Sequence, residues 1–212
     1  VYEVKAQSAY IVNTDTNIIV YDKDSQKQVW AGGLTKYMTI ALVMTNYADQ
    51  LDNTFTMPFA ISDYVHNTDN ADMRSGETFT YREAIYAMVT RNANEAAMGL
   101  AYELSGGDLA GWVSQMNTLS QRIGTTGSTW TDACGLDRGN TTTAVDMYLI
   151  LRYLMSLMRS KKFQRPDLHD AGQGKARQEL CAAEPERCAE QDQRRQLLPQ
   201  RDAGRHVRRD GL

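Results

Sequence analysis

The sequence of 212 residues has no apolar run near the roughly 18 residues that a membrane-spanning helix needs, and no charged start followed by an apolar stretch. Its only cysteines are Cys134, Cys181 and Cys188, without a C-x-x-C pair or histidines at metal-ligand spacing, so neither a disulfide framework nor a zinc site is supported. The formal net charge of -3 offers no basic stripe for phosphates. We expect no membrane span, no metal or other cofactor and no nucleic-acid partner.

Residue types are distributed unevenly along the chain. Residues 1–163 contain all 10 Met, all 11 Tyr, all 3 Trp and all 4 Phe, with every Ile, Ser, Thr and Asn. Residues 164–212 contain none of these and carry 9 of the 16 Arg. Because such a segment has little apolar area to offset the entropy of ordering, its default state is disorder. The sequence predicts a folded domain over 1–163 and a disordered or frameshifted tail over 164–212.

The first part of the chain has the pattern of an α/β domain. Tyr10 and Val12, then Ile18 and Val20, alternate on either side of the turn "NTDTN", which predicts a hairpin of two half-buried strands. From residue 34 to about 46 the apolar residues go all the way round a helix, which is typical of a buried one.

Three further helical segments follow. One runs through Ile85, Met88 and Val89, with a helical stretch that ends at the glycines 106 and 107. Asp108 is a predicted N-cap for the next helix. Two apolar stripes that step by 4, 3 and 4 predict amphipathic helices whose stripes lie in the core: Trp112, Met116, Leu119 and Ile123, then Met147, Leu151, Leu154 and Met158.

A lysine opens the buried helix in the run "AGGLTKYMT". Lys36 would lie where the helix N-terminus already carries partial positive charge, and burial disfavours an ammonium. Both effects lower the pKa of the amine, as a general base requires. The alternative is that the Lys36 side chain extends to the surface.

The order of three stretches resembles the serine D-Ala-D-Ala carboxypeptidases, the low-molecular-mass penicillin-binding proteins. They are "AYIVNTDTNIIVYDKDSQKQVWAGGLTKYMT", "MRSGETFTYREAIYAMVTRNANEAA" and "WVSQMNTLSQRIGTTGSTWTDACGLDRGNTTTAVDMYLILRYLM". The resemblance implies a fold with an antiparallel sheet flanked by helices, beside a helical region, here truncated. It also implies an extracytoplasmic location, in the periplasm or at the cell surface, with a signal peptide that this sequence does not include.

The family's motifs SxxK, SxN and KTG are incomplete here. The SxxK register keeps Lys36 as the base but places Gly33 at the nucleophile position, and a glycine cannot form an acyl-enzyme. The SxN register places Asn92 where a serine is expected and keeps Asn94, the residue that contacts the substrate amide in the family. No KTG follows residue 163. Read one nucleotide later, "LHDAG" is compatible with Thr-Met-Pro-Ala, so a frameshift near residue 164 is one explanation.

The resemblance implies a domain that acts on peptidoglycan stem peptides ending in D-Ala-D-Ala by acyl-enzyme chemistry, and we expect this chain to have lost it. β-Lactams would bind covalently only with a serine restored at Gly33. The alternatives are a peptide-binding pseudoenzyme and an α/β domain with no wall role. A class A β-lactamase is disfavoured because "DACGLDRGNTTT" has no glutamate. An incomplete sheet would leave an apolar edge exposed, which predicts self-association.

Overall fold

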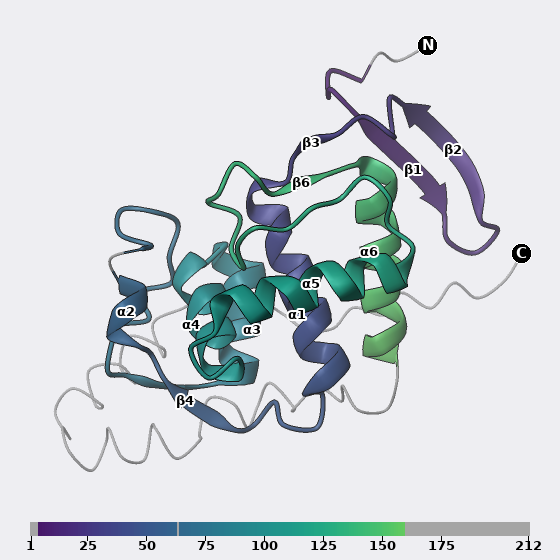
Figure 1. Ribbon diagram of the computed structural model, residues 1–212. Coiled ribbons are helices and arrows are strands. Elements are labelled where there is room, and N and C mark those ends of the chain that lie inside the picture. Colours follow the sequence, from purple (N-terminus) through teal and green to yellow (C-terminus); the bar gives the residue numbers. More distant parts are fainter. Residues whose placement is uncertain (1–3, 63, 160–212) are drawn as a thin grey trace, which may run out of the picture. The chain divides into compact units, whose positions relative to one another are not determined.

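The computed structural model describes residues 4–62 and 64–159 (Figure 1). The tail expected at 164–212 lies outside the described residues. The mixed α/β class is confirmed, with helices and small antiparallel sheets. The strands are β1 (Ala9–Asn13), β2 (Ile18–Lys23), β3 (Val29–Trp30), β4 (Thr54–Thr56), β5 (Thr78–Thr80) and β6 (Thr141–Thr142). The helices are η1 (Gly32–Leu34), α1 (Thr35–Asn46), α2 (Phe59–Ser62), α3 (Tyr81–Arg91), α4 (Asn94–Leu104), α5 (Leu109–Ile123) and α6 (Ala144–Arg159).

The described strands form three antiparallel pairs, β1 with β2, β3 with β6 and β4 with β5. The predicted hairpin is confirmed, with Asn13 opposite Ile18 and a register shift between Ile11 and Val12. Its burial was predicted wrongly for the second strand: Ile18 is 62% exposed and Val20 is 65% exposed. Strand alternation shows which residues share a face, but a face is buried only if another element covers it.

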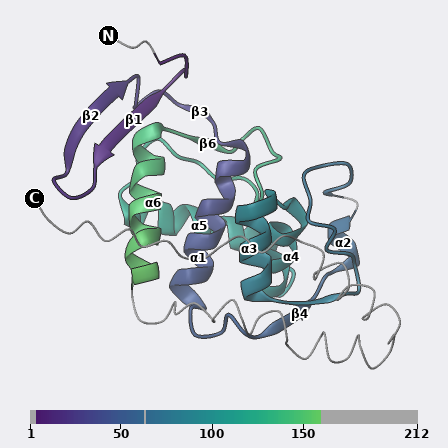
Figure 2. The ribbon, with the colours of Figure 1, turned by 180° about the vertical axis from the view of Figure 1, so that it is seen from behind.

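Helix α1 is the centre of the described core, as its apolar residues predict. It contacts α3, α4, α5 and α6, and both views show it between α6 and the α3–α4 pair (Figures 1 and 2). Met38, Ala41 and Val43 are fully buried on different sides of the helix. A helix that is apolar all round is therefore buried all round.

Polar caps fix the helices that flank α1. Thr80 and Glu83 form a reciprocal capping box at the start of α3, and the Asp108 carboxylate accepts a hydrogen bond from the Gly111 amide at 2.8 Å, which confirms Asp108 as the N-cap of α5. Helix α3 ends at Asn92 in the left-handed conformation, with φ 53°. Asparagine is among the few residues other than glycine that adopt this conformation readily.

The two predicted amphipathic stripes differ in their burial. On α5, Trp112, Met116 and Leu119 are buried as expected. On α6, Met147 and Leu154 are buried, but two predicted core positions were wrong: Leu151 is 38% exposed and Met158 is 48% exposed. None of the helices in the described ranges is long and apolar enough to cross a membrane.

Candidate functional site

Lys36 lies one residue inside α1 and is 2% exposed, so it does not extend to the surface. Its Nζ donates a hydrogen bond to the carbonyl oxygen of Cys134 at 2.9 Å. Burial lowers the pKa of Lys36 below its ordinary value, and nearby groups oppose this less strongly: Cys134, Asp69, Asp132 and Glu95. The direction of this pKa shift is the one predicted for a lysine that serves as a general base.

The segment that receives Lys36 is a turn organised by one carboxylate. Asp132 is 6% exposed and accepts hydrogen bonds from the amides of Cys134, Gly135 and Asp137. Gly135 has φ 96°, and a Cβ there would collide with the carbonyl oxygen of Gly32. The turn therefore fits closely against the start of α1 only with glycine at position 135.

Cys134 itself is a buried free thiol. It is 1% exposed, and burial raises its pKa to about 12, with Asp132 adding to the effect. A thiol with so little thiolate is a poor nucleophile. Cys134 is therefore a packed thiol, and the atom of this residue that contacts Lys36 is its backbone oxygen.

Gly33, Lys36 and Asn92 line one pocket of about 360 Å³, which we call the Lys36 pocket. The remaining described residues that line it are Leu34, Tyr37, Ile40, Met88 and Val89. The positions 33 and 36 share a helical face, as the spacing of three requires. The described lining of this pocket does not include Asn94.

The two asparagines of the SxN-like segment are held by the same residue, Asp69. The Asn92 side-chain amide donates to the Asp69 carboxylate at 2.6 Å, and the backbone amide of Asn94 donates to the Asp69 carbonyl oxygen at 3.0 Å. Asn94 opens α4 and is 4% exposed. The geometry therefore places Asn92 toward Gly33 and fixes Asn94 at the helix start.

Sequence reasoning missed the acidic residues that support the site. Glu95 is 4% exposed and accepts from the amides of Ala71 and Met73, which fastens the loop containing Asp69 to α4. Asp69 lies 23 residues from Asn92, and Cys134 lies 98 residues from Lys36. No local pattern marks contacts of that separation. Within the described residues, no cluster of three or more His, Cys, Asp or Glu side chains could hold a metal ion.

Comparison with known proteins gives the family of the chain. A protein-family model described as D-alanyl-D-alanine carboxypeptidase (Peptidase_S11) matches residues 1–170. The chain belongs to this carboxypeptidase family. It is 25% identical to the D-alanyl-D-alanine carboxypeptidase DacF of Bacillus subtilis over 75% of this chain and 41% of that protein, and 26% identical to DacB2 of Mycobacterium tuberculosis over 71% of this chain and 51% of that protein.

Solved structures of the carboxypeptidase family share the fold. The DD-transpeptidase of Streptomyces K15 superposes with a TM-score of 0.69 and 25% identity over 76% of this chain and 64% of that one. A D-alanyl-D-alanine carboxypeptidase of M. tuberculosis superposes with a TM-score of 0.65 and 22% identity, over 74% of this chain and 58% of that one. The chain thus spans 41% to 51% of the length of the curated relatives it matches.

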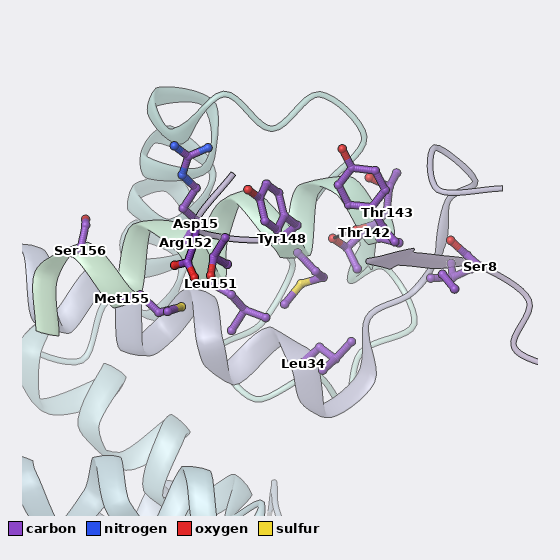
Figure 3. A pocket seen from close by; sticks show the side chains of 16 residues that line it. Ser8, Asp15, Leu34, Thr142, Thr143, Tyr148, Leu151, Arg152, Met155 and Ser156 are labelled. Carbon is purple, nitrogen blue, oxygen red and sulfur yellow. Dashed lines mark hydrogen bonds between the residues drawn. The ribbon is translucent and has the colours of Figure 1, made fainter. Parts of the chain in front are cut away.

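A second cavity, larger than the Lys36 pocket at about 810 Å³, lies along α6 (Figure 3), and we call it the α6 groove. Figure 3 shows Tyr148, Leu151 and Met155 on the helix, with Leu34 reaching the groove from the start of α1. Leu34 also lines the Lys36 pocket, so the two cavities adjoin at that residue. The groove therefore borders the predicted catalytic residues.

Proposed function

We propose that residues 1–163 are part of a serine D-Ala-D-Ala carboxypeptidase domain that acts on peptidoglycan stem peptides outside the cytoplasmic membrane, and that this chain cannot form an acyl-enzyme. The observation that carries the proposal is the burial of Lys36 beside a pocket in which position 33 is glycine. The base is present and poised, and the nucleophile is missing.

The chemistry that such a site performs requires an oxygen at position 33. A serine hydroxyl would pass its proton to the Lys36 amine as the oxygen attacks the peptide carbonyl. That proton would go to the nitrogen of the terminal D-Ala as the C–N bond breaks, and water would then hydrolyse the ester and restore the serine hydroxyl. Gly33 supplies no oxygen. Asn92 can donate and accept hydrogen bonds, but a neutral amide is a poor proton relay in place of a serine. We therefore assign Lys36 the position of the base, with no covalent step. Asn94 has the position of the substrate-amide contact by its place in the SxN register alone, since it is not among the described residues that line the Lys36 pocket.

Fluorescent penicillin tests this proposal, because it attaches covalently where an acyl-enzyme can form. We expect no labelling of the natural chain by intact mass, with the Streptomyces K15 enzyme as the positive control. Gly33→Ser combined with Asn92→Ser restores both serine positions but not KTG, and any adduct that this variant gains should disappear when Lys36→Ala is added. A covalent adduct on the natural chain would overturn the proposal.

A peptide-binding pseudoenzyme is the second candidate, favoured by the open Lys36 pocket of about 360 Å³. Such a protein would hold the peptide without cleaving it. Calorimetry with a peptide ending in D-Ala-D-Ala, compared with the same peptide ending in L-Ala-L-Ala, separates the two candidates. Binding selective for the D-isomers supports the pseudoenzyme, and the absence of heat from both peptides contradicts it.

A further inference from the structure

The Asn92 side chain occupies the space that a side chain at position 33 would need. A Cβ built on Gly33 would lie 2.6 Å from Oδ1 of Asn92, 3.1 Å from its Nδ2 and 3.2 Å from its Cγ. Contacts below 3.0 Å are essentially never made by a real Cβ, so one of the two residues would have to move. The backbone of Gly33 is not the obstacle, because its φ lies outside the left-handed region.

Two constraints hold the Asn92 side chain in that place. Its Nδ2 donates to the carboxylate of Asp69 at 2.6 Å, a hydrogen bond strengthened by the negative charge of its acceptor. Its backbone adopts φ 53°, which fixes the direction in which the side chain leaves the chain. Asn92 is exposed, so the amide could swing into solvent, but it would lose the bond to Asp69.

We propose that Gly33 and Asn92 form a steric pair, in which the Asn92 amide fills the space that a side chain at position 33 would need. A serine at position 33 alone would displace the amide from Asp69, so the two positions are compatible only when they change together. The reading of position 33 as the nucleophile position rests on the proposed function, but the steric pairing does not.

The pairing also defines what the pocket offers a ligand. Because Nδ2 donates to Asp69, Oδ1 is the amide atom nearest to the Cβ position of Gly33 and the one left to accept a hydrogen bond. The Lys36 pocket thus presents a hydrogen-bond acceptor at the place where the family has a hydroxyl group. A ligand group with an N–H or O–H donor fits this position, whereas a bare carbonyl oxygen does not.

A double-mutant cycle tests the pairing without any ligand. Alanine adds only a Cβ, and in a helical turn it is ordinarily favoured over glycine. The first background is Asn92→Gly, which removes the amide and tolerates positive φ. In this background, Gly33→Ala is expected to raise Tm by about 2–4 °C relative to Asn92→Gly alone. In the natural chain the same Gly33→Ala change is expected to lower Tm or leave it unchanged.

The sign of the alanine effect decides the result. Equal Tm shifts of Gly33→Ala in both backgrounds would show that the two positions are independent and would overturn the pairing. If Asn92→Gly prevents folding, Asp69→Ala serves as the second background, because it releases the amide without removing it. There, too, the penalty of Gly33→Ala should shrink, and an undiminished penalty would overturn the pairing. Neither measurement of Tm involves peptide or penicillin. The pairing can therefore be tested even if the proposed function is wrong.

Discussion

Apolar side chains are buried around α1 and exposed around the β1–β2 hairpin. Around α1, side chains such as Met38 and Trp112 are fully buried by neighbouring helices. On the hairpin and along α6, Ile18 is 62% exposed and Met155 is 45% exposed. The described residues close the core that holds Lys36, and they leave the second region partly uncovered. The helix that carries Lys36 can therefore be well packed although the described sheets beside it are small.

Core truncation should show the largest difference between the two regions. Trp112→Ala removes a fully buried side chain from α5 and is expected to cost about 3–5 kcal/mol in the free energy of unfolding. Ile18→Ala, the matched change on the hairpin, removes an exposed side chain and should cost no more than about 0.5 kcal/mol. Urea titration measures both. Similar costs at the two positions would mean that the hairpin is covered in solution.

Thiol reactivity compares the same regions chemically. The pKa of Cys134 is raised to about 12 by burial, against an ordinary value of 9.0, so its thiolate fraction at pH 8 falls by about 10³. Iodoacetamide should therefore modify Cys134 at least about 10³-fold more slowly than a cysteine introduced by Val20→Cys, at a position that is 65% exposed. Peptide mapping by mass spectrometry follows each site separately. Comparable rates at Cys134 and at position 20 would refute burial of the thiol.

The buried Lys36 amine should lower the free energy of unfolding, because burial disfavours its charged form. Its pKa is lowered by burial in the folded chain, so between that value and the ordinary 10.5 the unfolded state binds more protons, and stability rises with pH in this window. Lys36→Met should remove this rise and stabilise the fold by about 1 kcal/mol at neutral pH.

The control for Lys36→Met is Lys27→Met, which removes the same positive charge at an exposed position. Thermal unfolding at pH 7 and pH 9.5 measures both variants. If Lys36→Met instead lowers the free energy of unfolding, as a core truncation would, the Lys36 amine stabilises the fold and the prediction is wrong.

Local sequence patterns predicted the first hairpin, the longer helices and one cap correctly. They failed to predict burial where it depends on an element far away in the sequence. The hairpin, the helix from Thr35 and the N-cap at Asp108 depend on neighbours along the chain, and each was found. Burial at Ile18 and Leu151 depends on what covers those faces, and both were predicted wrongly.

For the site, the spacing of Gly33 and Lys36 was visible in the sequence because three residues span one helical turn. The carboxylate of Asp69 that restrains Asn92 comes from a loop 23 residues away, and no periodicity marks it. The Lys36 amine donates its hydrogen bond to the carbonyl oxygen of Cys134. This is a backbone atom, so no residue type at that position could have predicted the contact.

Self-association should depend on the exposed apolar side chains of the hairpin and α6, and changes to these side chains should have little effect on the free energy of unfolding. In the described residues β1 pairs only with β2, so its second edge is unpaired, and Ile11 and Met155 are 51% and 45% exposed. Unpaired edges next to apolar side chains favour pairing between chains, and lysine there opposes it. Ile11→Lys and Met155→Lys should each reduce concentration-dependent association while changing the free energy of unfolding by about 0.5 kcal/mol or less.

Sedimentation over a range of protein concentrations measures this association. Gln121→Lys, which adds the same charge to an exposed position on α5, separates the loss of apolar surface from a change in net charge. If all three variants dissociate equally, net charge explains the effect and the hairpin region has no special role. If the natural chain stays monomeric at every concentration, the exposed edge is protected in solution, and the contrast between the two regions applies to packing alone.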